Sequence, residues 1–159
     1  MLMLFAPLSL FAQQKFGHVD IDNVMQSMPE YTAAVQELEK LGKQYEQELT
    51  SSQTELQRLA EEYEKTKSTL SATQQQEKEA DLQEKYQRIT EQAQQNQQAF
   101  QRAQQEKIAP IQQRIMQAIE AVGRAGGYVY ILQKGSLPYI NDSISKDVTS
   151  DVKAQLAKK

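Results

Sequence analysis

The stretch that decides the fold is YTAAVQELEKLGKQYEQELTSSQTELQRLAEEYEKTKSTL at residues 31–70. Starting at Tyr31, mostly apolar or small side chains recur at alternating spacings of four and three residues as far as Leu70. This heptad repeat predicts a long helix with a narrow apolar stripe, and the Glu, Gln and Lys residues between the stripe positions predict a solvated outer surface. A stripe of this kind needs a second helix to cover it.

The second helix follows along the same chain. From Leu82 to Ala103 the spacing continues, and after a slip of one residue it resumes at Ile108. Ser71 and Gln74 form a capping box that would start the returning helix, so we place the hairpin tip near residues 67–74. We therefore predict an antiparallel helical hairpin over residues 31–107. The larger apolar residues of its coiled-coil seam are Tyr45, Leu49, Leu56, Leu59, Tyr63, Leu70, Leu82, Tyr86, Ile89 and Phe100.

Pro110 lies inside the returning helix, beside the slip in the heptad repeat. Proline has no N–H to donate to the carbonyl of the preceding turn, and its ring crowds that carbonyl. We therefore expect a kink or a break at Pro110 and interpret this residue as a hinge between the arm and the rest of the chain.

Three short segments outside the hairpin have the composition of β-strands. They are residues 16–21, residues 128–132 after the glycine pair at 126–127, and residues 137–140, where Pro138 favours an edge position. A short final helix over residues 150–157 would be capped by Thr149. The fold class that we expect is α+β and predominantly helical.

The two ends of the chain, residues 13–30 and 108–159, are expected to fold together into a small β-rich body. Three short strands leave open sheet edges, and oligomerisation through the body would cover them. The residues that we expect to build this assembly surface are Phe16, Val19, Ile21, Tyr128, Val129, Tyr130, Ile131 and Tyr139.

The first twelve residues, MLMLFAPLSLFA, form a continuous apolar run that turns polar at Gln13. A run of this length is too short to span a bilayer as a helix, which needs about 20 residues. It is typical of the apolar region of a secretory signal peptide, with cleavage after Ala12. We therefore expect an exported protein that is either a soluble protein of the cell envelope or extracellular.

The composition excludes several kinds of chemistry. The 159 residues contain no Cys and a single His, so disulfides, thiol catalysis and zinc sites with two imidazoles are ruled out. His18, Asp20 and Asp22 alternate and would project from one face of a strand as candidate metal or acid–base groups. The interpretation that we favour is that Asp20 or Asp22 caps a short helix and that His18 lies on a partly exposed face. We expect no enzyme, no cofactor and no metal.

The charge pattern also limits the partners. Residues 31–107 carry 14 acidic and 10 basic side chains, a net charge of −4, within a chain of net charge −3, so attraction to nucleic acid is not expected. Thin arms with scattered apolar side chains offer many weak contacts rather than one pocket. Such a surface suits unfolded polypeptides of varied sequence.

Several segments, taken in order, resemble one known family. They are GHVD at residues 17–20, MPEY at residues 28–31, API at residues 109–111 and DVTSDV at residues 147–152. Over about residues 15–156 the chain resembles the Skp/OmpH family of periplasmic chaperones. The resemblance implies a homotrimer in which the short strands form a central β-barrel and three helical hairpins extend as tentacles around a cavity.

The resemblance also implies a function. It is that of an ATP-independent holdase, which keeps unfolded outer-membrane proteins from aggregating in the periplasm. Members of the family are often basic, whereas the arms here are acidic, so we carry over no membrane or lipopolysaccharide site. The alternative that we consider is a structural coiled-coil spacer or adaptor of the cell envelope that binds one folded partner.

Overall fold

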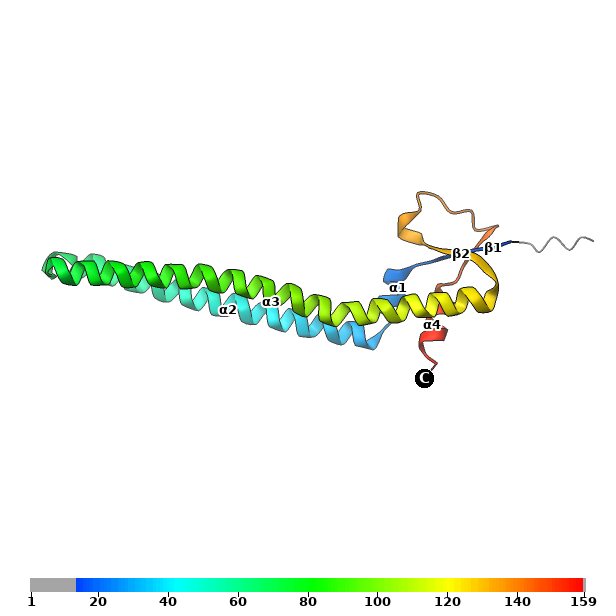
Figure 1. Cartoon of the computed structure of the whole chain (residues 1–159), viewed down its shortest axis with the longest axis horizontal. Helices are drawn as coiled ribbons and strands as arrows, with labels where there is room; N and C mark the ends of the chain where they lie inside the picture. The colour runs from blue at the N-terminus through cyan, green and yellow to red at the C-terminus, as the bar shows by residue number, and fades with distance from the viewer. Residues whose placement is uncertain (1–13, 159) are drawn as a thin grey trace, which may run out of the picture. The chain divides into compact units, whose positions relative to one another are not determined.

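The computed structural model describes residues 14–158, and the predicted signal peptide lies outside them. The described chain forms two compact units, one of residues 30–110 and one of residues 14–29 together with 111–158. Two long helices dominate the first unit and a small three-stranded sheet lies in the second (Figure 1). The predicted α+β, predominantly helical fold class is confirmed.

Residues 30–110 form the predicted antiparallel hairpin (Figure 1). Helix α2 covers Pro29–Thr66, the short 3-10 helix η1 covers Lys67–Thr69, and helix α3 begins at Ala72 and ends at Gly126. The capping box at the tip is formed as predicted. The backbone N–H of Ser71 donates to Oε1 of Gln74 at 3.0 Å, and the N–H of Gln74 donates to Oγ of Ser71 at 3.4 Å.

The seam of the hairpin follows the heptad pattern with one correction. Leu38 and Tyr63 are buried, and most other seam residues are half-buried. Tyr86, predicted to lie in the seam, is 64% exposed, and Lys85 is the half-buried residue at this level. Both residues fit the spacing between Leu82 and Ile89. The long aliphatic stem of a lysine can cover apolar surface while its ammonium group remains in water.

Of the kink or break expected at Pro110, the break is wrong, because α3 continues through this residue without interruption, and the kink stays a prediction. Pro110 is exposed, so the carbonyl that it leaves without a donor can be hydrated on the outer side of the helix. The boundary between the two compact units nevertheless falls between Pro110 and Ile111. A hinge at this position stays a prediction.

The second unit contains a three-stranded sheet with β1, Lys15–Val19, in its centre. Strand β2, Tyr128–Gln133, and strand β3, Ser145–Asp147, both pair with β1 in parallel. Two short helices belong to the same unit: α1, Ile21–Gln26, follows β1, and α4, Thr149–Leu156, follows β3. The first two strands and the last helix agree with the sequence prediction to within two residues.

The third strand was predicted in the wrong place. We expected it at residues 137–140, whereas the structure has β3 at Ser145–Asp147 and no strand at 137–140. Because β3 is parallel to β1, as β2 is, the chain must return to the starting end of the sheet before it can pair again. The residues between Gln133 and Ser145 make this return, and the backbone N–H of Val148 then donates to the carbonyl of His18 at 2.9 Å.

The core of this unit consists of small and medium aliphatic side chains from four elements and one loop. The largest fully buried side chains are Val19, Val24, Ile115, Val148 and Val152. Gly127 ends α3 with a φ of 66°, a left-handed conformation that glycine adopts without a steric penalty. This confirms the helix stop predicted from the glycine pair.

Candidate functional site

The three polar residues singled out near the N-terminus do not converge on one site. Asp20 caps α1, since its Oδ1 accepts a hydrogen bond from the N–H of Asn23 at 2.9 Å, which resolves the choice between Asp20 and Asp22. Asp22 is exposed in the first turn of α1. Across residues 14–158, His, Asp and Glu side chains form no group of three that could hold a metal ion.

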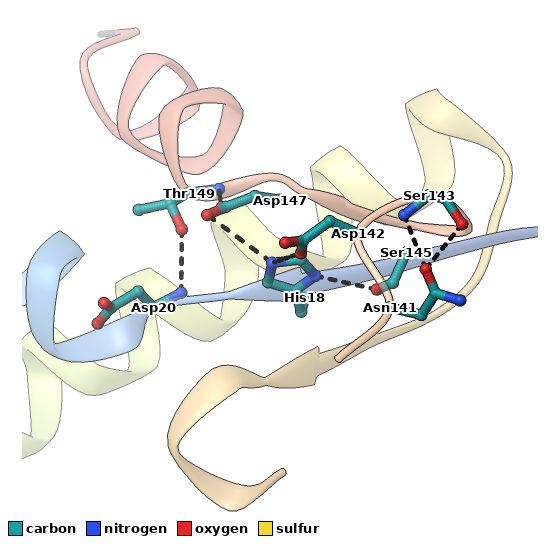
Figure 2. Close-up of polar contacts among 8 residues, drawn as sticks. All are labelled: His18, Asp20, Asn141, Asp142, Ser143, Ser145, Asp147 and Thr149. Atoms are coloured by element: carbon teal, nitrogen blue, oxygen red, sulfur yellow. Dashed lines mark hydrogen bonds and ion pairs between the residues drawn. The ribbon is translucent and has the colours of Figure 1, made fainter. Parts of the chain in front are cut away.

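His18 is buried, with 2% of its surface exposed, so the expectation that it lies on a partly exposed face is wrong. The reason is its position on the central strand of the sheet. Figure 2 shows His18 surrounded by the loop and strand that approach β1 from the C-terminal end of the chain. Its Nδ1 lies 2.9 Å from Oγ of Ser145, and its Nε2 lies 3.9 Å from Asp142 and 3.8 Å from Asp147.

The polar groups around His18 also form hydrogen bonds with one another. Partial burial works to raise the pKa of Asp147, but hydrogen bonds from Thr149 and the nearby charge of His18 outweigh burial and hold this pKa below its usual value. The hydroxyl of Thr149 accepts a hydrogen bond from the N–H of Asp20 at 3.0 Å. The prediction that Thr149 caps the last helix is wrong, because Val148 occupies the cap position of α4. The cluster joins β3 to β1 and has a structural role.

The hairpin carries a candidate binding surface. A groove of about 530 Å³ lies between α2 and α3, with Gly42, Tyr45 and Leu49 on one side and Ala93 and Phe100 on the other. The remaining lining residues are Glu46, Asn96, Gln97, Gln101 and Gln104. Sequence reasoning placed several of these residues in the seam but did not predict a groove. The signal was the absence of a side chain at the seam position Gly42.

Asn96 stands out within this groove. Its Nδ2 is buried, and within the described chain it has no hydrogen-bond partner. A buried donor without an acceptor costs about 1–3 kcal/mol. The hairpin is therefore less stable at this level than an apolar seam would be.

The tip is held by contacts between the two helices. The hydroxyl of Tyr63 donates to Oε1 of Glu79 at 2.6 Å, and Nζ of Lys67 lies 3.6 Å from the same carboxylate and 5.3 Å from the centre of the Tyr63 ring. The hydrogen bond to Glu79, together with burial, raises the pKa of Tyr63 to about 12. The same hydrogen bond, with the charge of Lys67, lowers the pKa of Glu79 although burial opposes it.

These shifts predict how the tip depends on pH. The folded chain binds the Tyr63 proton more tightly than the unfolded chain, so this contribution to stability is present below pH 10.0 and is lost as the pH rises towards about 12. The contribution of Glu79 is present above pH 4.5 and is lost as the pH falls through its lowered value.

The measurement is the phenolate absorbance of the wild type minus that of the Tyr63→Phe variant, recorded against pH. The difference isolates one tyrosine, and we expect its midpoint near pH 12 rather than at the ordinary value of 10.0. In a Glu79→Gln background the midpoint should move down. A wild-type midpoint at the ordinary value would contradict the hydrogen bond.

The second unit exposes apolar side chains around its sheet. Strand β2 is an edge strand, and Val129, Tyr130 and Leu132 on it are exposed. In the segment after it, Tyr139 is 77% exposed and Ile144 is also exposed. Of the other residues predicted to build the assembly surface, Val19 is buried in the core, and the rest are half-buried: Phe16, Ile21, Tyr128 and Ile131.

Comparisons with known proteins assign the chain to a family. Residues 15–156 match the family model described as outer membrane protein (OmpH-like), and the chain belongs to this family. This confirms the resemblance drawn from the sequence segments. The family is non-enzymatic, so the chain is not an enzyme. Within residues 14–158, no helix has the length and apolar character that crossing a membrane requires.

The chain is similar to the chaperone protein Skp of two bacteria. It is 28% identical over 155 residues to Skp of Pectobacterium atrosepticum, covering 98% of this chain and 93% of that one. It is 28% identical over 142 residues to Skp of Yersinia enterocolitica, covering 89% and 85% respectively. A crystal structure of an OmpH-like putative outer membrane chaperone from Caulobacter crescentus has the same fold, with a TM-score of 0.76, 20% identity and coverage of 98% and 89%. The chain is thus a member of the Skp/OmpH-like chaperone family.

Proposed function

We propose that this protein is an ATP-independent holdase of the periplasm, which encloses unfolded outer-membrane proteins between its helical hairpins and prevents their aggregation. Family membership supports the chaperone class. The observation that carries the proposal is the hairpin surface. It offers half-buried apolar residues along the seam and a shallow, open apolar groove.

Such a surface explains how a holdase can work without nucleotide. Each apolar contact with an unfolded chain is weak, but several contacts made together by one chain raise its overall affinity through effective concentration. Because the contacts do not require one shape, clients of different sequence can bind. Release needs only that a competing state, such as folding into a membrane, removes the same apolar segments from water.

The holdase is proposed to act as a homotrimer joined through the second unit. The exposed residues Val129, Tyr130 and Leu132 on the edge strand β2 support an assembly surface there, since an open apolar edge invites pairing with another chain. Export through the apolar segment at residues 1–12 supports the periplasm as its location.

The experiment is dilution of a urea-denatured outer-membrane β-barrel protein into buffer without ATP, with light scattering followed over time. At one trimer per client we expect scattering to be suppressed, and an unrelated acidic protein at equal concentration serves as the control. Scattering equal to that of the control would overturn the proposal. Native mass measurement of the mixture gives the number of subunits and clients in each complex.

The same assay separates the holdase from the alternative of an envelope spacer. A spacer or adaptor binds one folded partner tightly and leaves unfolded chains to aggregate, whereas a holdase protects several unrelated barrel proteins. Protection of at least two unrelated clients supports the proposal, and protection of none favours the spacer.

A further inference from the structure

The groove between α2 and α3 has room for a side chain that the hairpin does not supply. Gly42 has no side chain to fill the groove, and the ring of Phe100 lies beside it: a Cβ built at Gly42 would meet Cε2 of that ring at 3.5 Å, an ordinary contact distance. Tyr45, Leu49 and Ala93 extend the apolar lining. The one charged residue among the lining residues is Glu46.

We propose that this groove binds a large apolar side chain of an unfolded polypeptide segment that carries Lys or Arg close to that side chain. The inference rests on the proposed holdase function and names the kind of client segment that the hairpin prefers. The apolar lining accounts for the large side chain, and the charges of the hairpin account for the basic neighbours.

Several cations of the hairpin are already neutralised by carboxylates of the same hairpin. Arg58 pairs with Glu55 and Glu62, and three further cations are paired with hairpin carboxylates. These pairs are Lys67 with Glu79, Arg88 with Glu84, and Lys107 with Glu37. Since residues 31–107 carry 14 acidic and 10 basic side chains, the surplus charge is negative.

Glu46 carries part of this surplus into the groove. Within residues 14–158 it forms no ion pair with another side chain, so its carboxylate is available to a ligand. A Lys or Arg beside a bound apolar side chain would come close to this carboxylate. A partly exposed pair of this kind adds a modest affinity and weakens with salt.

Asn96 gives the groove a hydrogen-bond donor for the backbone of an occupant. Its side chain lines the groove and its Nδ2 has no partner within the described chain. The terminal torsion of an asparagine is broad, so a turn of the amide would present this donor to a carbonyl group of an occupant. An extended polypeptide has such carbonyls free of intramolecular hydrogen bonds along its length.

The test uses the full chain and a short unstructured fluorescent peptide with a central Phe flanked by Lys residues, and measures binding by fluorescence anisotropy. Two comparison peptides replace Phe by Ser or the flanking Lys by Glu. We expect the peptide with Phe and Lys to bind best, and its affinity to fall as salt is raised. Equal affinity for the Lys-flanked and Glu-flanked peptides would overturn the charge argument.

Variants at Gly42 test the groove itself. Gly42→Leu fills the space and should weaken binding of the Phe peptide by about fivefold or more, roughly 1 kcal/mol. Gly42→Ala is the matched control, because both substitutions favour the helix over glycine but alanine leaves most of the groove open. Equal binding by Gly42→Leu and Gly42→Ala, with unchanged helix content, would overturn the inference.

Variants at Glu46 test the source of the charge preference. Glu46→Gln should remove most of the difference between the Lys-flanked and Glu-flanked peptides, while Glu39→Gln, an exposed position outside the groove lining, should leave it unchanged. An equal effect of the two variants would assign the preference to the net charge of the hairpin and contradict a role for the groove.

Failure of this inference is distinguishable from failure of the proposed function. If the wild type suppresses aggregation of barrel proteins but Gly42→Leu binds peptides like the wild type, the groove assignment fails and the holdase stands. If the wild type suppresses no aggregation, the holdase itself fails.

Discussion

Replacing Ile115 by Ala is expected to lower the stability of the unit formed by residues 14–29 and 111–158 by about 2–5 kcal/mol. Ile115 is 1% exposed and is among the largest fully buried side chains of this unit. Removing its outer carbons loses apolar burial and leaves a cavity that the neighbouring side chains fill only in part. The loss is a large share of the stability of a small core, since native domains are typically stable by only about 5–15 kcal/mol.

Hydrogen exchange followed by mass spectrometry measures this loss locally. Peptides that cover β1 and α4 should exchange about 30-fold faster or more, the equivalent of the lower end of the expected range. Gln112→Ala, an exposed position on the same helix, should change exchange little. Unchanged protection in Ile115→Ala would show that Ile115 is not part of the core.

Replacing Asn96 by Leu is expected to raise the free energy of unfolding of the hairpin by about 1–3 kcal/mol, whereas Ile115→Ala lowers stability. The buried Nδ2 of Asn96 has lost its water and gained no partner within the described chain. Leucine removes this unpaired donor and adds apolar surface to a seam that already contains Leu49, Ala93 and Phe100. A polar residue at one seam position is a known means of fixing register at the expense of stability.

Thermal unfolding followed by circular dichroism checks this prediction, because the signal comes mainly from the two long helices. For a chain of this size, each kcal/mol shifts the midpoint by about 2–4 °C, so we expect a clear rise. Gln98→Leu, an exposed position beside Asn96, is the control and should shift the midpoint little. A lower midpoint for Asn96→Leu would mean that the amide has a partner in the assembled protein.

The features predicted correctly from the sequence depend on neighbours along the chain. The heptad repeat gives the hairpin, Ser71 and Gln74 give the start of the return helix, and Asp20 gives the start of α1. The two helix starts rest on groups three residues apart, and the heptad repeat is a spacing of three and four residues along each helix. Such contacts form whenever the local backbone is helical, so the sequence contains the information needed to predict them.

The errors concern interactions between residues that are distant in sequence. Placing the third strand at residues 137–140 was wrong because the parallel pairing of β3 with β1 decides where the chain can add a strand. The exposure of His18 was wrong because its burial depends on Ser145 and Asp147, which lie more than 120 residues away. Tyr86 and Lys85 both fit the heptad period, and only packing against α2 decided which residue enters the seam.

For the candidate binding surface too, some features could be predicted from the sequence and others depend on tertiary packing. A long acidic hairpin with a thin apolar seam can be predicted from residues 31–107 read in order, because helix periodicity and charge do not depend on distant residues. The packing of α2 against α3 sets two further features: Gly42 and Phe100 lie together in one groove, and Asn96 lies there without a partner within the described chain. The physical reason is that a groove is a space between two helices, and its shape depends on how residues about 50 positions apart pack together.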